Sequence, residues 1–174
     1  MKHLLVVVDI QNDFVDGALG SKEAVNIVDN AAKKIDDFDG EIFVTFDTHF
    51  ENYMDTSEGK KLPVPHCIKG TNGWDLNFKI AESLCKKKYI KVEKNTFGSC
   101  ELPELIMKTV GNEDFDITLI GLCTDICVVS NALILKANFP QKEIYVDACC
   151  CAGVTTQTHN AALETMKMCQ INVI

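Results

Sequence analysis

A cysteine at the start of a predicted helix is the strongest candidate for a reactive residue in the sequence. The apolar run 117–120 predicts a buried strand, and beyond Gly121 the pair Thr124-Asp125 begins a segment whose apolar residues have helical spacing. Cys127 therefore falls in the first turn of a helix that follows the carboxyl end of a strand. Unpaired N–H groups and positive potential there stabilise a thiolate or a nearby oxyanion. The alternative is that Cys123 and Cys127 are small buried side chains, as most free cysteines are.

Charged side chains also stand at the ends of three other predicted strands. Asp9 ends the first apolar run, Asp47 and His49 follow the second, and Lys94 follows the third. If the strands are parallel, their carboxyl ends meet at one edge of the sheet, where sites in such folds form. An acid, a lysine and a cysteine would then converge, which strengthens the case for Cys127 as a nucleophile.

The segment 48–76 has no sustained periodicity and is rich in Gly and Pro. A loop of this length inside a compact domain is usually functional or disordered. It follows Asp47 and contains His49, Glu58 and His66, which form a suitable ligand set for zinc, iron or manganese. The alternative is that these loop histidines simply face solvent. The other two histidines, His3 and His159, have no acidic partner at ligand spacing, and we expect them to be structural or at the surface.

Short apolar runs alternate with helix-period segments along the chain, which predicts an α/β fold with a mostly parallel sheet covered by helices on both faces. We expect one domain, residues 1–174, because this length suits a single core. The predicted strands are 4–9, 41–46, 89–93, 117–121, 143–148 and 171–174, and the predicted helices are 22–36, 77–87, 101–110, 125–138 and 156–169.

Composition excludes several classes of function. The formal net charge is −8, and Lys86–Lys88, interpreted as a solvated helix end, is the only basic cluster, so nucleic acid and anionic membranes are poor partners. No apolar run reaches membrane-spanning length and the N-terminus lacks a signal-peptide cleavage region, so we expect a cytoplasmic protein. The nine cysteines include no C-x2-C pair, and a disulfide framework is not expected in a reducing cytosol. We interpret Cys149–Cys151 as packing residues.

Three separated motifs resemble those of the isochorismatase-like cysteine hydrolases, and most closely the nicotinamidase branch of that family. They are D-I-Q-N-D-F from Asp9, V-E-K-N-T-F around Lys94, and G-L-C-T-D-I-C ending at Cys127, and the likeness extends from residue 4 to about residue 169. The resemblance implies a three-layer fold around a six-stranded parallel sheet and an Asp9–Lys94–Cys127 triad. It also implies a cis peptide bond between Leu122 and Cys123.

The nicotinamidase branch further implies a divalent metal, most often zinc, with iron or manganese as other choices. Its ligand pattern matches Asp47, His49 and His66, and the remaining ligand is matched by Glu58 or, as a substitute, by Asp55. Phe14 and Phe97 match aromatic positions of the substrate pocket. The stretch 62–65 reads Leu-Pro-Val-Pro, where members of this branch tend to carry an aromatic residue that stacks on the pyridine ring.

The activity implied by the resemblance is hydrolysis of nicotinamide to nicotinate and ammonia through a thioester. Asp9 would exchange protons, Lys94 would hold Asp9 and Cys127 ionised, and the backbone N–H groups of Cys123 and Cys127 would bind the oxyanion. The metal would orient the ring nitrogen. Alternatives are the same triad acting on another amide, a ureido compound or isochorismate, and a non-catalytic family member that binds a small molecule. The family also suggests a homo-oligomer.

Overall fold

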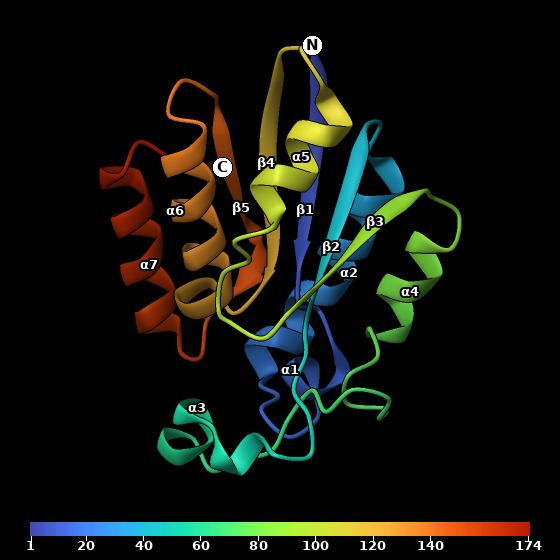
Figure 1. Cartoon of the computed structure of the whole chain (residues 1–174), viewed down its shortest axis with the longest axis vertical. Helices are drawn as coiled ribbons and strands as arrows, with labels where there is room; N and C mark the ends of the chain where they lie inside the picture. Colours follow the sequence, from blue (N-terminus) through green and yellow to red (C-terminus); the bar gives the residue numbers. More distant parts are fainter.

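A six-stranded parallel sheet forms the centre of the molecule, in a computed structural model that describes all residues 1–174 (Figure 1). The strand order is β3-β2-β1-β4-β5-β6, and every neighbouring pair is parallel. The α/β prediction is confirmed, because six strands and five longer helices lie at the predicted positions with ends shifted by a few residues. The strands are β1 (Lys2–Val8), β2 (Glu41–Asp47), β3 (Tyr89–Lys94), β4 (Phe115–Leu122), β5 (Ile144–Ala152) and β6 (Asn172–Val173).

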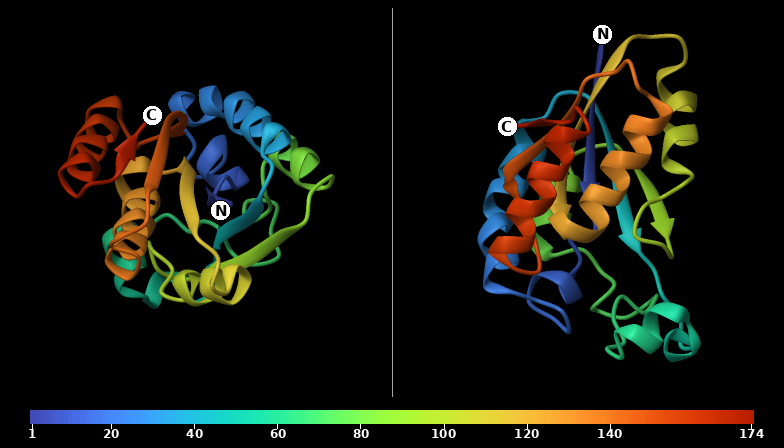
Figure 2. Two further views of the ribbon diagram at one scale, coloured as in Figure 1. Left: turned by 90° about the horizontal axis from the view of Figure 1, so that it is seen from above. Right: turned by 90° about the vertical axis from the view of Figure 1, so that its left-hand side faces the viewer.

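Helices cover both faces of the sheet. An apolar cluster lies on each face of the sheet, between the strands and the helices that cover them. Helices α1, α2 and α4 pack on one face, and α5, α6 and α7 pack on the other. The view from above shows α2 and α4 on the opposite side of the sheet from α5 and α6 (Figure 2). The helices are α1 (Asn12–Val15), α2 (Lys22–Asp37), α3 (Ser57–Lys61), α4 (Phe78–Leu84), α5 (Leu102–Val110), α6 (Val129–Asn138) and α7 (Thr156–Met168), with a 3-10 turn η1 (Tyr53–Asp55) and a π-helical turn η2 (Thr124–Val128).

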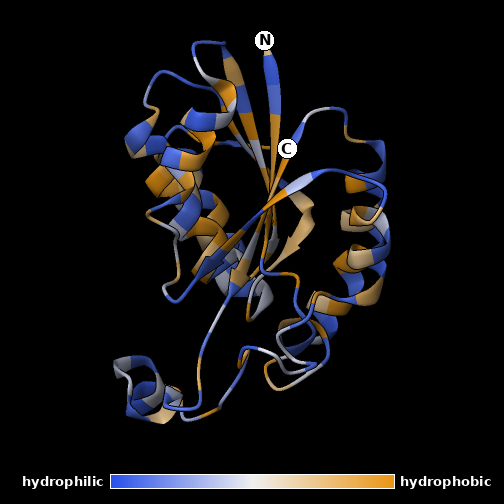
Figure 3. Cartoon of the chain, turned by 45° about the vertical axis from the view of Figure 1, so that its right-hand side comes forward, coloured by the Kyte–Doolittle hydropathy of each residue, from blue (hydrophilic) through white to orange (hydrophobic).

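The apolar pattern of the sequence explains these layers. Residues Leu4 to Val8 of β1 are fully buried, as expected for a central strand covered on both faces. Helix α2 begins at its N-cap Ser21, whose Oγ accepts a hydrogen bond from Ala24 N at 3.0 Å, and its buried residues from Ala24 to Ile35 form one stripe. Figure 3 shows the hydrophobic colour concentrated on the strands and on the sheet-facing sides of the helices. None of the helices combines the length and the apolar character needed to cross a bilayer.

Two expectations need correction. The segment 48–76 is not without regular structure, because it contains η1 and α3; the Thr56 hydroxyl caps α3 by accepting a hydrogen bond from Gly59 N at 3.0 Å. A five-residue helix is too short to leave a periodic signal in the sequence. In the triplet, Cys150 and Cys151 pack as predicted, but Cys149 is exposed, because it lies where the register between β5 and β4 shifts and the regular alternation of faces is interrupted.

Candidate active site

The carboxyl ends of four adjacent strands bring the candidate residues together. Asp9 follows β1 immediately, Asp47 ends β2, Lys94 ends β3, and Cys127 lies in η2 just beyond β4. The strand register pairs Asp47 directly with Lys94, which places the two side chains at the same height on neighbouring strands. Asp9 has a φ of 49°, in the left-handed region that Asp tolerates better than most residues, and the chain turns there. The predicted convergence is therefore present in the fold.

Asp9, Lys94 and Cys127 form a buried cluster. Nζ of Lys94 lies 2.6 Å from Oδ2 of Asp9 and 3.6 Å from Sγ of Cys127, and all three residues are at most 6% exposed. The Thr45 hydroxyl donates a hydrogen bond of 2.6 Å to Oδ1 of Asp9 and so orients the carboxylate. Oδ2 of Asp9 pairs with the ammonium of Lys94, and both side chains are almost fully buried, so this ion pair is shielded from water.

Burial and charge set the protonation of this cluster. Burial raises the pKa of Cys127 well above its ordinary value; the charge of Asp9 raises it further, and that of Lys94 opposes the rise. Burial also raises the pKa of Asp9 against the effect of Lys94, which makes Asp9 a better base. The pKa of Lys94 is raised although burial alone lowers it, because the carboxylates of Asp9 and Asp47 place negative charge beside the ammonium. Burial and the charge of Asp9 therefore oppose ionisation of the Cys127 thiol, whereas the charge of Lys94 favours it.

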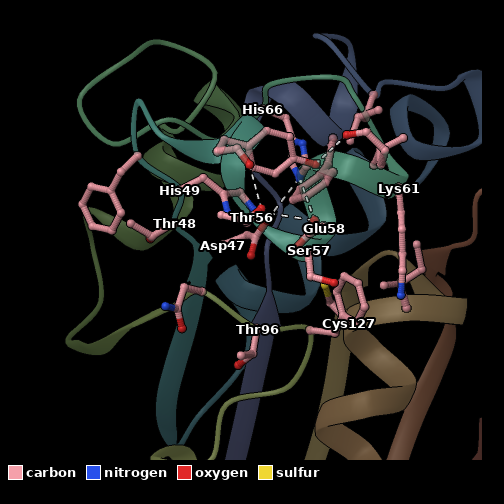
Figure 4. A pocket seen from close by; sticks show the side chains of 18 of the residues that line it. Asp47, Thr48, His49, Thr56, Ser57, Glu58, Lys61, His66, Thr96 and Cys127 are labelled. Carbon is pink, nitrogen blue, oxygen red and sulfur yellow. Dashed lines mark hydrogen bonds and ion pairs between the residues drawn. The ribbon is translucent and has the colours of Figure 1, made fainter.

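Asp47, His49 and His66 meet beside this cluster in an arrangement that can hold a metal ion. Their ligand atoms lie within 4.8 Å of one another, and all three residues are buried. Nε2 of His49 lies 3.0 Å and Nε2 of His66 lies 3.5 Å from Oδ2 of Asp47 (Figure 4). Nδ1 of His66 is hydrogen-bonded to the Val64 carbonyl at 2.8 Å, which leaves Nε2 free to bind a metal. Two imidazoles and a carboxylate form a donor set that fits zinc or a similar divalent ion.

Glu58 is placed to complete this ligand set, whereas Asp55 is exposed to solvent. Oε1 of Glu58 lies 3.7 Å from Nε2 of His49 and 3.6 Å from Nε2 of His66. Helix α3, which follows the Thr56 cap, carries the Glu58 side chain over the two histidines (Figure 4). The geometry therefore favours Glu58 over Asp55 as the remaining ligand, which agrees with the resemblance to the nicotinamidase branch.

Gln11 is a structural part of the site that sequence reasoning did not assign. Its side chain accepts a hydrogen bond from Asp47 N at 2.8 Å and donates to the carbonyls of Asp47 at 2.9 Å and Trp74 at 2.8 Å. Asp13 acts similarly on the loop of His66, because its Oδ2 accepts a hydrogen bond of 2.8 Å from Cys67 N. Both residues belong to the D-I-Q-N-D-F motif, so the motif contained the signal, but their role depends on contacts between distant segments.

The turn that carries Cys127, η2 with the preceding Cys123, has the backbone geometry that the resemblance implied. The peptide bond between Leu122 and Cys123 is cis, as predicted. The Cys123 carbonyl accepts hydrogen bonds from Ile126 N at 3.1 Å and Val128 N at 3.0 Å, which closes η2 around Cys127. Helix α6 continues directly from this turn.

A cavity of about 700 Å³ connects the cysteine to the metal ligands. Phe14 and Phe97, the two predicted pocket residues, both line it. Asp9 and Lys94 do not line the cavity; Lys94 contacts its lining residues Cys127 and Asp47, and Asp9 pairs with Lys94. Leu62, from the stretch 62–65, also lines the cavity. The sequence did not single out several other lining residues, among them Leu19, Phe50, Tyr53, Lys61 and Ile126. Tyr53 is fixed by a hydrogen bond of 2.9 Å to the Leu62 carbonyl, and its ring packs edge-on against His49 with centroids 4.8 Å apart.

Comparison with known proteins agrees with this geometry. The model of the isochorismatase domain matches residues 3–174. The chain belongs to the isochorismatase family. An uncharacterized isochorismatase family protein, PncA, of Bacillus subtilis (strain 168) is 30% identical over 143 residues, covering 76% of this chain and 78% of its own. The nicotinamidase/pyrazinamidase of Mycobacterium tuberculosis is 28% identical, covering 98% and 97%.

The fold is shared with solved members of the isochorismatase family. The crystal structure of nicotinamidase/pyrazinamidase PncA from Bacillus subtilis superimposes with a TM-score of 0.85 at 26% identity, and the match covers 99% of both chains. The three-layer arrangement and the six-stranded parallel sheet expected from the motifs are therefore those of the family.

Proposed function

We propose that this protein is a cysteine-dependent amidohydrolase that converts nicotinamide to nicotinate and ammonia. One observation carries the proposal: the cavity that reaches Cys127 is also lined by Asp47, His49, Glu58 and His66. A carboxamide can therefore reach the thiol while another part of the same small molecule faces the metal ligands. The nicotinamidase/pyrazinamidase relatives described above support this assignment of substrate.

Acylation starts from the neutral thiol. Asp9 accepts the proton of Cys127, and the thiolate attacks the amide carbon, so that a C–S bond forms and the carbonyl electrons move to oxygen. The N–H groups of Cys123 and Cys127 stabilise this oxyanion. The C–N bond then breaks, and Asp9 returns the proton to the departing ammonia. Lys94 stabilises the negative charge that passes between Asp9 and Cys127.

Deacylation uses the same residues in reverse order. Asp9 removes a proton from water, the resulting hydroxide attacks the thioester carbon, and the C–S bond breaks to release the carboxylic acid and regenerate the thiol. Phe14 and Phe97 provide apolar surface for the ring of the substrate. A divalent metal held by Asp47, His49, His66 and Glu58 would supply a coordination position for the ring nitrogen and so orient the substrate.

A second substrate class is a small amide or ureido compound without a ring nitrogen. The feature that favours it is Leu62, which lines the cavity in a stretch, 62–65, that contributes no aromatic residue to hold a ring. A non-catalytic binding role is disfavoured, because a purely binding protein has no need for a thiol packed against a buried acid and a lysine.

The test is release of ammonia by the purified, metal-loaded protein from nicotinamide, pyrazinamide, an aliphatic amide and an N-carbamoyl amino acid. We expect nicotinamide and pyrazinamide to be the best substrates, and Cys127→Ala to lose at least about 10³-fold in kcat/KM, since removal of a nucleophile is among the most costly single changes. Cys149→Ala, which changes an exposed cysteine of β5, is the matched control and should retain activity. Preference for the aliphatic or carbamoyl compound would replace the proposed substrate, and full activity of Cys127→Ala would reject the mechanism.

A further inference from the structure

Two contacts hold the turn η2: one comes from the start of α7, and the other from the segment that joins β5 to α7. Nδ1 of His159 lies 2.8 Å from Oγ1 of Thr124, which is fully buried. The carboxylate of Asp125 accepts a hydrogen bond from Val154 N, at 3.1 Å to Oδ1 and 3.2 Å to Oδ2. Consecutive residues of η2 are thus fixed from outside, by residues more than 25 positions later in the chain.

His159 is itself held rigidly. It lies in the first turns of α7, where its backbone N–H donates to the Thr155 carbonyl at 2.9 Å, and Thr155 and Thr158 form a capping box at the helix start. The chain packs closely around it, because a Cβ added at Gly153 would lie 2.9 Å from both the backbone N and the Cβ of His159. The imidazole therefore presents Nδ1 to Thr124 from a fixed position.

Thr124 lies between Cys123 and Cys127, the two residues whose N–H groups form the oxyanion hole of the proposed reaction. We propose that His159 is a positioning residue for this oxyanion hole, acting through the Thr124 hydroxyl. The inference rests on the proposed function, because it is the proposed hydrolysis that forms an oxyanion at these two N–H groups. A neutral imidazole can make the bond as donor or acceptor, and in both cases it fixes the rotation of the Thr124 side chain and the orientation of the adjoining peptides.

The role differs from that of an ordinary packing residue, because His159 contacts neither the cavity nor the Asp9–Lys94–Cys127 cluster. Its loss should therefore spare the binding of substrate and the acidity of the thiol, and should affect only the stage at which negative charge forms on the carbonyl oxygen. An aldehyde gives direct access to that stage. Pyridine-3-carboxaldehyde can add to the Cys127 thiol to give a thiohemiacetal: the C–S bond forms as the π bond of the carbonyl breaks, and the thiol proton passes to the oxygen. The former carbonyl oxygen then lies where the oxyanion of the reaction would lie.

The experiment compares native protein, His159→Ala, His159→Asn and Thr124→Val. We expect His159→Ala to lower kcat for nicotinamide by about 10- to 100-fold, less than the loss of a whole oxyanion donor, with KM changed by less than about 2-fold. Inhibition by the aldehyde should weaken by a similar factor, whereas the Kd of nicotinate, which makes no thiohemiacetal, should stay the same. Thr124→Val should reproduce the pattern. His159→Asn should recover part of the loss, because a carboxamide can still hydrogen-bond to the hydroxyl.

Thr158→Val is the matched control. The Thr158 hydroxyl belongs to the capping box in the same turn of α7, where it accepts a hydrogen bond from Thr155 N, but it makes no hydrogen bond to η2. Its removal should therefore lower Tm without lowering kcat. Equal losses of kcat in Thr158→Val and His159→Ala at equal Tm would overturn the inference, and so would native kcat in His159→Ala. If the native protein hydrolyses no amide, the proposed function fails; weaker aldehyde addition in His159→Ala would still support the positioning role, and unchanged addition would reject it.

Discussion

Asp47 contacts Lys94 through one carboxylate oxygen, Oδ1, which lies 3.3 Å from Nζ of the lysine. Its other oxygen, Oδ2, faces the two histidines, at 3.0 Å from Nε2 of His49 and 3.5 Å from Nε2 of His66. Asp47 therefore belongs to both halves of the site and links the charge at the metal ligands to the charge around the thiol. The Gln11 side chain is hydrogen-bonded to both the N–H and the carbonyl of Asp47. The Asp47 side chain therefore has little freedom to turn away from either Lys94 or the histidines.

Removal of the Asp47 charge should affect both halves at once. Burial is the main cause of the raised pKa of Cys127, and the negative charge of Asp47 raises it further. In metal-free protein, Asp47→Asn should therefore shift the midpoint of Cys127 alkylation to lower pH, and after reconstitution it should bind less metal than the native protein. Alkylation must be followed on the Cys127 peptide by mass spectrometry, because Cys85, Cys100, Cys149 and Cys169 are exposed and react as well.

His49→Ala provides the control for this prediction. It removes a metal ligand but leaves the contact between Asp47 and Lys94, so it should lower metal content without moving the midpoint in metal-free protein. The link through Asp47 would be refuted if the two variants gave the same midpoint.

The charge of Lys94 should have the opposite effect on the thiol. The ammonium lies 3.6 Å from Sγ of Cys127 and lowers the pKa of the thiol. Lys94→Met should therefore move the alkylation midpoint to higher pH and reduce kcat/KM by roughly 10²-fold or more, in line with the loss of a preorganised charge in an active site. Lys91→Met changes a partly exposed lysine of the same strand and should leave both quantities unchanged. A midpoint that stays in place in Lys94→Met would mean that the lysine does not influence the thiol.

The sequence predicted the fold better than the details of the site. Continuous apolar runs and a clear helical stripe such as that of α2 are local signals, so the strands, the helices and the convergence of Asp9, Lys94 and Cys127 could be inferred. The roles of Gln11 and His159 could not, because both depend on hydrogen bonds to residues at least 35 positions away. The raised pKa of Cys127 could not be inferred either: the position at a helix start favours a thiolate, whereas burial and the charge of Asp9, which depend on the fold, raise the pKa of the thiol.

The fourth metal ligand can be tested with two substitutions that make the same chemical change. Glu58 lies 3.6 Å from Nε2 of His66, while Asp55, three residues earlier in the chain, is exposed. Glu58→Gln should weaken metal binding by about 10-fold or more, since loss of a ligand costs at least as much as loss of a group that orients one. Asp55→Asn should leave metal affinity unchanged. Titration of the metal-free proteins with zinc, followed by calorimetry, measures both. A larger effect of Asp55→Asn than of Glu58→Gln would reverse the assignment.

The role of the metal in substrate orientation separates nicotinamide from an amide without a ring nitrogen. If the ring nitrogen is held at Asp47, His49, Glu58 and His66, then native protein should hydrolyse nicotinamide much faster than benzamide, which has the same shape but no ring nitrogen. His49→Ala should lower kcat/KM for nicotinamide far more than for benzamide, because only the first substrate loses an interaction. Leu62 works against a large difference, since an aliphatic side chain holds an aromatic ring less firmly than a stacked ring does. Metal content, measured by elemental analysis on the same samples, confirms that the variant has lost the ion. Equal rates on the two amides in the native protein would show that the ring nitrogen is not recognised, while leaving the chemistry of Cys127 intact.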